Sequence, residues 1–301
     1  MRYRKLGIIS GLLTGLGGIS YYLTSKAYKP KCKDSRASYE AEIKKGMICQ
    51  EEFEQLPQEE VRITSDYACT VRGTYFPNDD SKDTVVILHG YSYTKYGSVR
   101  YMRMFYEAGY NVLIYDHRGH GLSGPSLCSM GHIEKYDLKT WLDWIEERNG
   151  TNGKIGTLGV SMGGATVLLH AAIDERVDFV IAECPYASVW EEFKYILKKE
   201  YGLPAFPILH IASILSKLKI GATFKDIAPE KGINKIDAPI LFIHGVQDTY
   251  VLPEASEKMY EQRKGPKKLY LVEEAKHADA YEVNPQAYEA TVKQFLEEWV
   301  E

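Results

Sequence analysis

The chain has 301 residues, of which 45% are apolar and 26% are charged, and its formal net charge is −4. This composition is typical of a globular protein and excludes an intrinsically disordered chain. The small negative charge gives no general electrostatic basis for binding nucleic acid. The five cysteines are scattered without a CxxC pair, which argues against a zinc ribbon and against a dithiol redox site.

The N-terminal segment is predicted to associate with a membrane. Basic residues precede an uncharged, mostly apolar run over 6–23, and lysines follow it. A helix of that length spans about 27 Å, close to the thickness of a bilayer core. Residues 1–27 are either an uncleaved signal anchor or a signal peptide cleaved after Ala27, which would make the protein secreted. We favour a single anchor in the cell membrane, because the run exceeds the usual ~7–15-residue apolar region of a signal peptide. Although the flanking charges leave topology open, we expect an extracytoplasmic catalytic domain.

Glycines in this run suggest a contact between two copies of the chain. Gly7, Gly11 and Gly15 lie four residues apart and would form one smooth face on a helix. Two such faces allow close helix packing, so a homodimer is one interpretation, and a glycine-rich segment without a partner is the other. Residues 28–57 are polar and mixed in character, and we expect them to form a tether or a helical stalk.

Strand-like and helical stretches alternate over the rest of the chain. The predicted strands are 59–65, 67–76, 84–90, 111–116, 154–160, 178–183, 239–245 and 267–273. The first two alternate polar and apolar residues, as half-buried antiparallel strands do, and the next two are continuous apolar runs typical of a doubly covered parallel sheet. The predicted helices are 98–109, 136–150 and 284–300. This alternation predicts an α/β domain over 58–301 with a mostly parallel sheet flanked by helices.

Residues 187–235 interrupt the alternation and are too long for a simple crossover. Their pattern indicates amphipathic helices broken by Gly202 and Pro204. We therefore expect a helical cap inserted over the carboxyl edge of the sheet. Four apolar cap residues are candidates for a substrate pocket, although packing of the cap onto the sheet is the commoner use of such residues. They are Trp190, Phe193, Leu203 and Phe206.

A serine between glycines marks the point where a predicted strand becomes a helix. Gly159-Val160-Ser161-Met162-Gly163 has the spacing of a nucleophile elbow, a sharp turn that lifts a serine hydroxyl clear of the backbone. In a parallel sheet this turn lies at the carboxyl edge, where ligands bind. The alternative is that Ser161 is only the N-cap of the following helix. The partner residues described next argue against that alternative.

A serine nucleophile needs a base and a carboxylate that orients the base. Asp248 and His277 each follow a predicted strand, in the chain order expected for this fold. We assign His277 as the base and Asp248 as its partner. Glu183 also follows a strand and is the alternative acid.

The backbone N–H groups of Tyr91 and Met162 are the candidates for stabilising an oxyanion. Met162 starts the helix after the serine, and Tyr91 lies in the loop after the strand 84–90, which supplies the second donor in this fold. The histidines His89, His117, His120 and His132 match no metal-binding spacing. We therefore expect no metal site.

These motifs resemble those of the α/β-hydrolase superfamily. The resemblance covers residues 58–301 and rests on His89-Gly90-Tyr91, on the serine motif 159–163, on Asp248 and His277, and on the run DHRGHGLSG at 116–124. The nearest in style are bacterial serine hydrolases that are monoacylglycerol-lipase-like or dienelactone-hydrolase-like and carry an N-terminal hydrophobic segment, together with peptidase relatives. The resemblance implies an α/β-hydrolase fold, hydrolysis without a cofactor, and a loop-shaping role for Asp116 and Arg118.

The sequence therefore predicts a serine hydrolase that cleaves small-molecule carboxylic esters through an acyl-enzyme. Cleavage of peptides or thioesters by the same residues remains an alternative. A membrane-anchored binding protein without catalytic activity is the alternative from a different class. The acyl chain length and the natural substrate are not encoded in any motif.

Overall fold

The computed structural model describes residues 2–79 and 81–300, and for residues 2–14 it describes the helical backbone alone. Within this part of the chain one sheet has eight strands in the order β1-β2-β4-β3-β5-β6-β7-β8. β2 is antiparallel to both of its neighbours, and every other pair is parallel. The strands are β1 Glu59–Thr64, β2 Thr70–Phe76, β3 Thr84–Leu88, β4 Asn111–Asp116, β5 Ile155–Val160, β6 Phe179–Glu183, β7 Ile240–Gly245 and β8 Lys267–Val272. The predicted α/β-hydrolase fold is confirmed.

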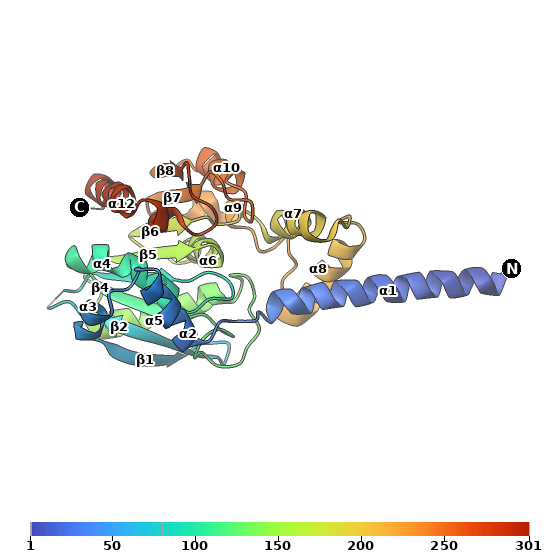
Figure 1. The fold of residues 1–301 in the computed structure, drawn as a ribbon, viewed down its shortest axis with the longest axis horizontal. Coiled ribbons are helices and arrows are strands. Elements are labelled where there is room, and N and C mark those ends of the chain that lie inside the picture. Colours follow the sequence, from blue (N-terminus) through green and yellow to red (C-terminus); the bar gives the residue numbers. More distant parts are fainter. Residues whose placement is uncertain (1, 80, 301) are drawn as a thin grey trace.

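Helices cover both faces of the sheet (Figure 1). Against one face lie α4 Val99–Glu107 and α12 Pro285–Trp299, and against the other lie α5 Glu134–Asn149, α6 Met162–Ala171 and α10 Glu254–Gln262. The shorter helical segments are η1 Lys95–Ser98, α9 Pro229–Gly232, η2 Ile233–Lys235 and α11 Ala280–Val283. The double coverage explains why the central strands are continuous apolar runs.

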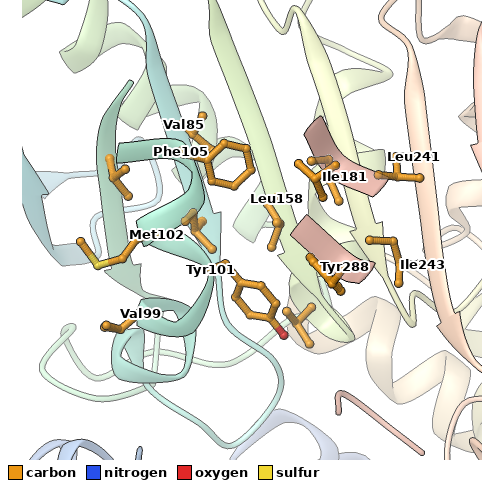
Figure 2. Packing of buried hydrophobic residues seen from close by; sticks show 14 of the residues in the cluster. Val85, Val99, Tyr101, Met102, Phe105, Leu158, Ile181, Leu241, Ile243 and Tyr288 are labelled. Carbon is orange, nitrogen blue, oxygen red and sulfur yellow. The ribbon is translucent and has the colours of Figure 1, made fainter. Parts of the chain in front are cut away.

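Successive residues of the buried strands pack into two separate cores. Val85 and Ile87 of β3 belong to the core under α4 and α12, whereas Val86 and Leu88 belong to the opposite core. Figure 2 shows the first core, where Phe105 of α4 packs close to Val85. The two-residue period of a strand therefore distributes one apolar run between both faces of the sheet.

The segment 187–235 contains two long helices, α7 Val189–Tyr201 and α8 Ile208–Ile220, which stand away from the sheet (Figure 1). α7 ends at Gly202, which adopts the left-handed conformation with φ 64°. Glycine is favoured there because it has no Cβ to clash. The expected break at this glycine is thus present, and the two helices form the cap.

The N-terminal helix α1 spans Arg2–Tyr28 and extends beyond the rest of the molecule (Figure 1). In the described part of the chain, no helix combines the length and the hydropathy that crossing a bilayer requires. Gly7 and Gly11 fall among the residues whose surroundings are not described, and a Cβ at Gly15 would meet nothing within 4 Å. The membrane anchor and the homodimer through these glycines therefore stay predictions.

Residues 28–57, predicted to form a tether or a helical stalk, contain two helices. These residues form α2 Ser35–Lys44 and α3 Gln50–Gln55, which pack on the domain. Ile48 and Phe53 are buried in the core that contains α4, and the buried Glu42 carboxylate pairs with Arg100 of α4. Tyr39, Ile43 and Leu56 of this segment also pack against that core.

We predict that Phe53→Ala destabilises the whole domain. The Phe53 ring lies 5.6 Å from the Phe76 ring, centroid to centroid, and is 8% exposed. Removing a buried aromatic ring costs about 3–5 kcal/mol of unfolding free energy. Urea unfolding measures this loss, with the exposed Glu51→Ala as the control from the same helix. A loss below about 0.5 kcal/mol, the range of a neutral surface change, would mean that α3 does not contribute to the core.

Candidate active site

The site is built on the sharp turn between β5 and α6. Ser161 adopts φ 55° and ψ −114° there, a conformation that residues with a Cβ rarely adopt. A Cβ on Gly159 would lie 2.2 Å from the Gly163 carbonyl oxygen, and a Cβ on Gly163 would lie 2.5 Å from the Leu88 carbonyl oxygen. Only glycine fits at both positions. The glycine spacing of the motif thus follows from the close approach of β3, β5 and α6.

The structure brings the predicted base and acid to this serine. His277 Nε2 lies 2.9 Å from Ser161 Oγ, and His277 Nδ1 lies 2.6 Å from Asp248 Oδ2. His277 follows β8 and Asp248 follows β7, so both residues stand at the carboxyl edge where β5 also ends. A neutral imidazole with its proton on Nδ1 donates to Asp248 and accepts from the Ser161 hydroxyl. This is the arrangement that activates a serine as a nucleophile.

Asp248 is held rigidly as a carboxylate. Its Oδ1 accepts hydrogen bonds from the backbone N–H groups of Tyr250, at 2.8 Å, and Val251, at 3.0 Å. Burial by itself would raise the pKa of Asp248, but hydrogen bonds from His244 and His277 outweigh burial and hold this pKa below its ordinary value. Asp248 therefore stays negatively charged at neutral pH and fixes the orientation of His277.

The alternative acid Glu183 serves a different part of the fold. Its Oε2 accepts a hydrogen bond from the Tyr288 hydroxyl at 2.9 Å, and burial raises the pKa of the carboxyl. In the described part of the chain, Asp248 is the carboxylate that is hydrogen-bonded to His277. The alternative is wrong because the Glu183 side chain turns toward α12 rather than along the carboxyl edge.

The loop after β3 is shaped by His89. One neutral tautomer satisfies both ring nitrogens, since Nδ1 donates to the Gly90 carbonyl at 2.7 Å and Nε2 accepts from the His117 N–H at 3.0 Å. Burial lowers the pKa of His89 to about 3, so the ring stays uncharged. A Cβ on Gly90 would lie 3.4 Å from the Ser161 Cβ, which places this loop directly against the serine.

The two candidate oxyanion donors flank the serine. Met162 is the first residue of α6, so its N–H has no acceptor within the helix. Tyr91 follows Gly90 and lines both of the cavities that meet at Ser161. Donation from these two N–H groups to a bound oxyanion stays a prediction.

The run 116–124 holds the neighbouring loop in place. Asp116 accepts hydrogen bonds from the backbone N–H groups of Lys95, at 2.7 Å, and Leu122, at 2.9 Å. Arg118 forms a buried two-point pair with Asp137, at 2.7 and 2.5 Å. Asp116 and Arg118 therefore bind other parts of the protein, namely backbone N–H groups and the Asp137 carboxylate. These contacts are what a loop-shaping role requires.

Cys184, Asp248 and His277 offer ligand atoms within 4.8 Å of one another, close enough to hold a metal ion. Burial raises the pKa of the Cys184 thiol well above its ordinary value, so in the absence of a metal ion the thiol is protonated at neutral pH. Asp248 and His277 are already hydrogen-bonded to each other. Two of the three residues are thus already engaged with each other and with Ser161.

Two cavities meet at Ser161. The cap cavity, of about 280 Å³, lies between α1, α7 and α8, and most of the residues that line it are apolar. The polar cavity, of about 570 Å³, is lined by Lys33, Lys45 and Arg100 among other polar residues. His277 lines the polar cavity and not the cap cavity. The serine thus stands between an apolar space and a polar one.

One predicted pocket residue lines the cap cavity and three do not. Phe193 faces the cavity, whereas Phe206 is 72% exposed in the connection between α7 and α8. Trp190 packs against His210 at 5.0 Å between ring centroids, and Leu203 packs within the cap. The assignment of Trp190, Leu203 and Phe206 is wrong because hydrophobicity alone does not give the direction in which a cap side chain points.

Sequence reasoning missed Glu192, which lines the cap cavity. Its side chain is 8% exposed, and Oε1 has no hydrogen-bond partner among the described residues. Burial, reinforced by the charge of Asp248, raises the pKa of Glu192 to about 8, so the carboxyl is mostly uncharged at neutral pH. Glu192 lies four residues before Ile196, which lines the same cavity, and this helical spacing was the available signal.

Comparison with known proteins identifies the family of this chain. Residues 79–231, just over half of the chain, match the family described as serine aminopeptidase S33. The uncharacterised protein YqkD of Bacillus subtilis is 36% identical over 291 residues, which cover 96% of this chain and 95% of that protein. The lysophosphatidylserine lipase ABHD12 of Danio rerio is 28% identical over 189 residues, covering 60% of this chain and 47% of that protein.

A solved structure shares the fold of this chain. An esterase of Pyrococcus furiosus superposes with a TM-score of 0.69 at 26% sequence identity, covering 83% of this chain and 94% of that one. The sheet and its flanking helices are therefore shared with a protein described as an esterase.

We predict that Asp248→Asn lowers kcat by roughly 10⁴-fold, because the amide would favour the wrong tautomer of His277. Glu183→Gln is the matched control, a buried carboxyl that is changed in the same way, and it should lower kcat by less than about tenfold. Steady-state ester hydrolysis measures both variants, with thermal melting to check folding. A larger loss in Glu183→Gln than in Asp248→Asn would reverse the assignment of the acid.

Proposed function

The chain belongs to the serine aminopeptidase S33 family of α/β-hydrolases, and from that premise we propose that it cleaves carboxylic esters through an acyl-enzyme on Ser161. The observation that carries this proposal is the hydrogen-bonded triad of Ser161, His277 and Asp248, which lies where the two cavities meet. Relatives described as an esterase and as a lysophosphatidylserine lipase favour an ester substrate.

The proposed reaction has two halves. Ser161 Oγ attacks the ester carbonyl carbon while His277 Nε2 takes the hydroxyl proton, and the backbone N–H groups of Tyr91 and Met162 stabilise the oxyanion. The ester C–O bond then breaks, and His277 gives its proton to the departing alcohol. Water attacks the acyl-enzyme with His277 again as the base, which releases the carboxylic acid and restores the serine.

The two cavities suggest how an ester lies in the site. The departing alcohol must receive a proton from His277, and His277 lines the polar cavity. The alcohol part therefore belongs in the polar cavity, and the acyl part belongs in the apolar cap cavity. We infer a substrate with an apolar acyl group and a polar alcohol group.

Ser161→Ala should lower kcat for p-nitrophenyl esters by roughly four orders of magnitude or more, because no nucleophile remains. Labelling by a fluorophosphonate should disappear in the same variant. Ser92→Ala, which changes a serine in the polar cavity, is the control and should keep its labelling. Unchanged ester turnover in Ser161→Ala would overturn the proposal, and a wild-type protein that is neither labelled nor active would be a binding protein.

Peptide cleavage is the second candidate, and Glu192 is the observation that favours it. A buried carboxyl in the cap cavity could pair with the ammonium group of an N-terminal residue, which fits the description of the matched family. Aminoacyl p-nitroanilides test this candidate, since Glu192→Gln would abolish their turnover and spare simple esters. Thioesters would react through the same steps and are compared in the same assay.

The pKa of Glu192 predicts a pH dependence for apolar esters. The carboxyl is uncharged below about pH 8 and ionised above it. Ionisation places a charge in the cap cavity, so kcat/KM for p-nitrophenyl octanoate should fall severalfold as pH rises through that range. Glu192→Gln should remove the fall, and p-nitrophenyl acetate should show little of it. Identical pH profiles for octanoate in the wild type and in Glu192→Gln would contradict this role.

A further inference from the structure

The C-terminal half of α1 is docked against the cap. Three hydroxyl side chains of α1, four residues apart, reach three positions of α8 that are also four residues apart. Ser20 Oγ lies 3.0 Å from the Ile208 carbonyl, Thr24 Oγ1 lies 3.4 Å from the Ala212 carbonyl, and Tyr28 Oη lies 2.5 Å from Ser216 Oγ. The Ser20 and Thr24 hydroxyls are each shared with a closer carbonyl of α1 itself, that of Leu16 at 2.9 Å and that of Ser20 at 2.7 Å. The constant offset means that the two helices run parallel, and the three α1 side chains are at most 1% exposed.

A second side of the same helix faces the cap cavity. Leu23 and Ala27 line it and are one helical turn apart, and Thr24 and Lys26 also contribute to the lining. The opposite wall is apolar and comes from α7 and α8, including Phe193, Ile196, Leu197 and Leu209. An apolar chain in this cavity would lie between α1 and the two cap helices.

The end of α1 also contacts the loop beside the serine. The Tyr91 hydroxyl donates a hydrogen bond to the Lys26 carbonyl at 2.9 Å, and the Cys128 N–H donates to the Tyr28 carbonyl at 3.0 Å. The end of α1 is therefore in direct contact with the loops beside the site. The buried pair of Tyr28 and Ser216 helps to hold α1 in this position, because a buried hydroxyl that loses its partner costs free energy.

We propose that Leu23 and Ala27 of α1 form the wall of the acyl-binding site that sets which acyl chain lengths the enzyme accepts. This proposal rests on the proposed ester hydrolysis and adds to it a class of substrate, esters of extended aliphatic acids. Each methylene buried in an apolar site contributes about fourfold to binding, or ~0.8 kcal/mol. A bulkier side chain on this wall therefore removes the contribution of the last methylenes and leaves short chains unaffected.

The proposal also bears on the processing of the chain. Leu23, Thr24, Lys26 and Ala27 all precede the bond that cleavage after Ala27 would break. Such cleavage would remove one wall of the cap cavity and expose the α8 surface that now pairs with Ser20 and Thr24. The proposal therefore requires that the active enzyme retain α1.

The test is a chain-length profile of the full-length protein with p-nitrophenyl esters from acetate to palmitate. Leu23→Trp and Ala27→Trp should shift the optimum toward shorter acids and lower kcat/KM for long esters more than tenfold relative to kcat/KM for acetate. Tyr22→Trp is the matched control on α1, because Tyr22 is 60% exposed and does not line the cavity. Leu23→Ala enlarges the site and should shift the optimum toward longer acids, which keeps the test decisive if a tryptophan variant does not fold.

Two readouts separate this proposal from the proposed function. Fluorophosphonate labelling of Ser161 reports an intact site in every variant, and the dissociation constant of a fluorescent lauric acid analogue reports the cavity without catalysis. Weaker binding of that analogue in Leu23→Trp but not in Tyr22→Trp supports the assignment of Leu23 to the acyl-binding site, even if no ester is hydrolysed. Unchanged binding and an unchanged chain-length profile in both Leu23→Trp and Leu23→Ala would overturn it.

Discussion

The close approach of three backbone segments at the turn after β5 is the constraint on which the rest of the site depends. Gly159 and Gly163 leave no room for a Cβ between β5, α6 and the end of β3, and Ser161 takes a strained conformation as a result. The parallel register pairs Leu88 with Gly159, so the loop after β3 arrives beside the serine. β7 and β8 continue the same parallel order, and their loops bring Asp248 and His277 to the same edge.

The two cavities that meet at Ser161 differ in polarity. The cap supplies an apolar space on one side of Ser161, and the loops of the sheet edge supply a polar space on the other. His277, which transfers the proton in the proposed reaction, lines the polar cavity and not the cap cavity. This asymmetry orients a bound ester with its alcohol part in the polar cavity. Glu192 is the exception on the apolar side, where burial keeps its carboxyl uncharged at neutral pH and so reduces the cost of its position.

Much of the fold and of the site could be predicted from local patterns. Continuous apolar runs gave the buried strands, and residues directly after strand ends gave His277 and Asp248 as candidates. Glu183 satisfied the same rule, and the sequence could not choose between the two acids because the choice depends on where each side chain turns beyond its strand. The pocket prediction failed at Phe206 for a related reason, since a residue between two helices has no helical phase from which to infer its direction.

The sequence by itself determined the order of strands and helices and the turn that carries Ser161, because periodicity and glycine spacing are local properties of the chain. Only the tertiary structure decided that α1 lines the cap cavity and that Phe53 belongs to the core. Ser20 and Ile208 are 188 positions apart, and their hydrogen bond depends on which faces of α1 and α8 meet. No local pattern encodes that choice, because burial and hydrogen bonding between distant segments are settled only when the whole chain packs.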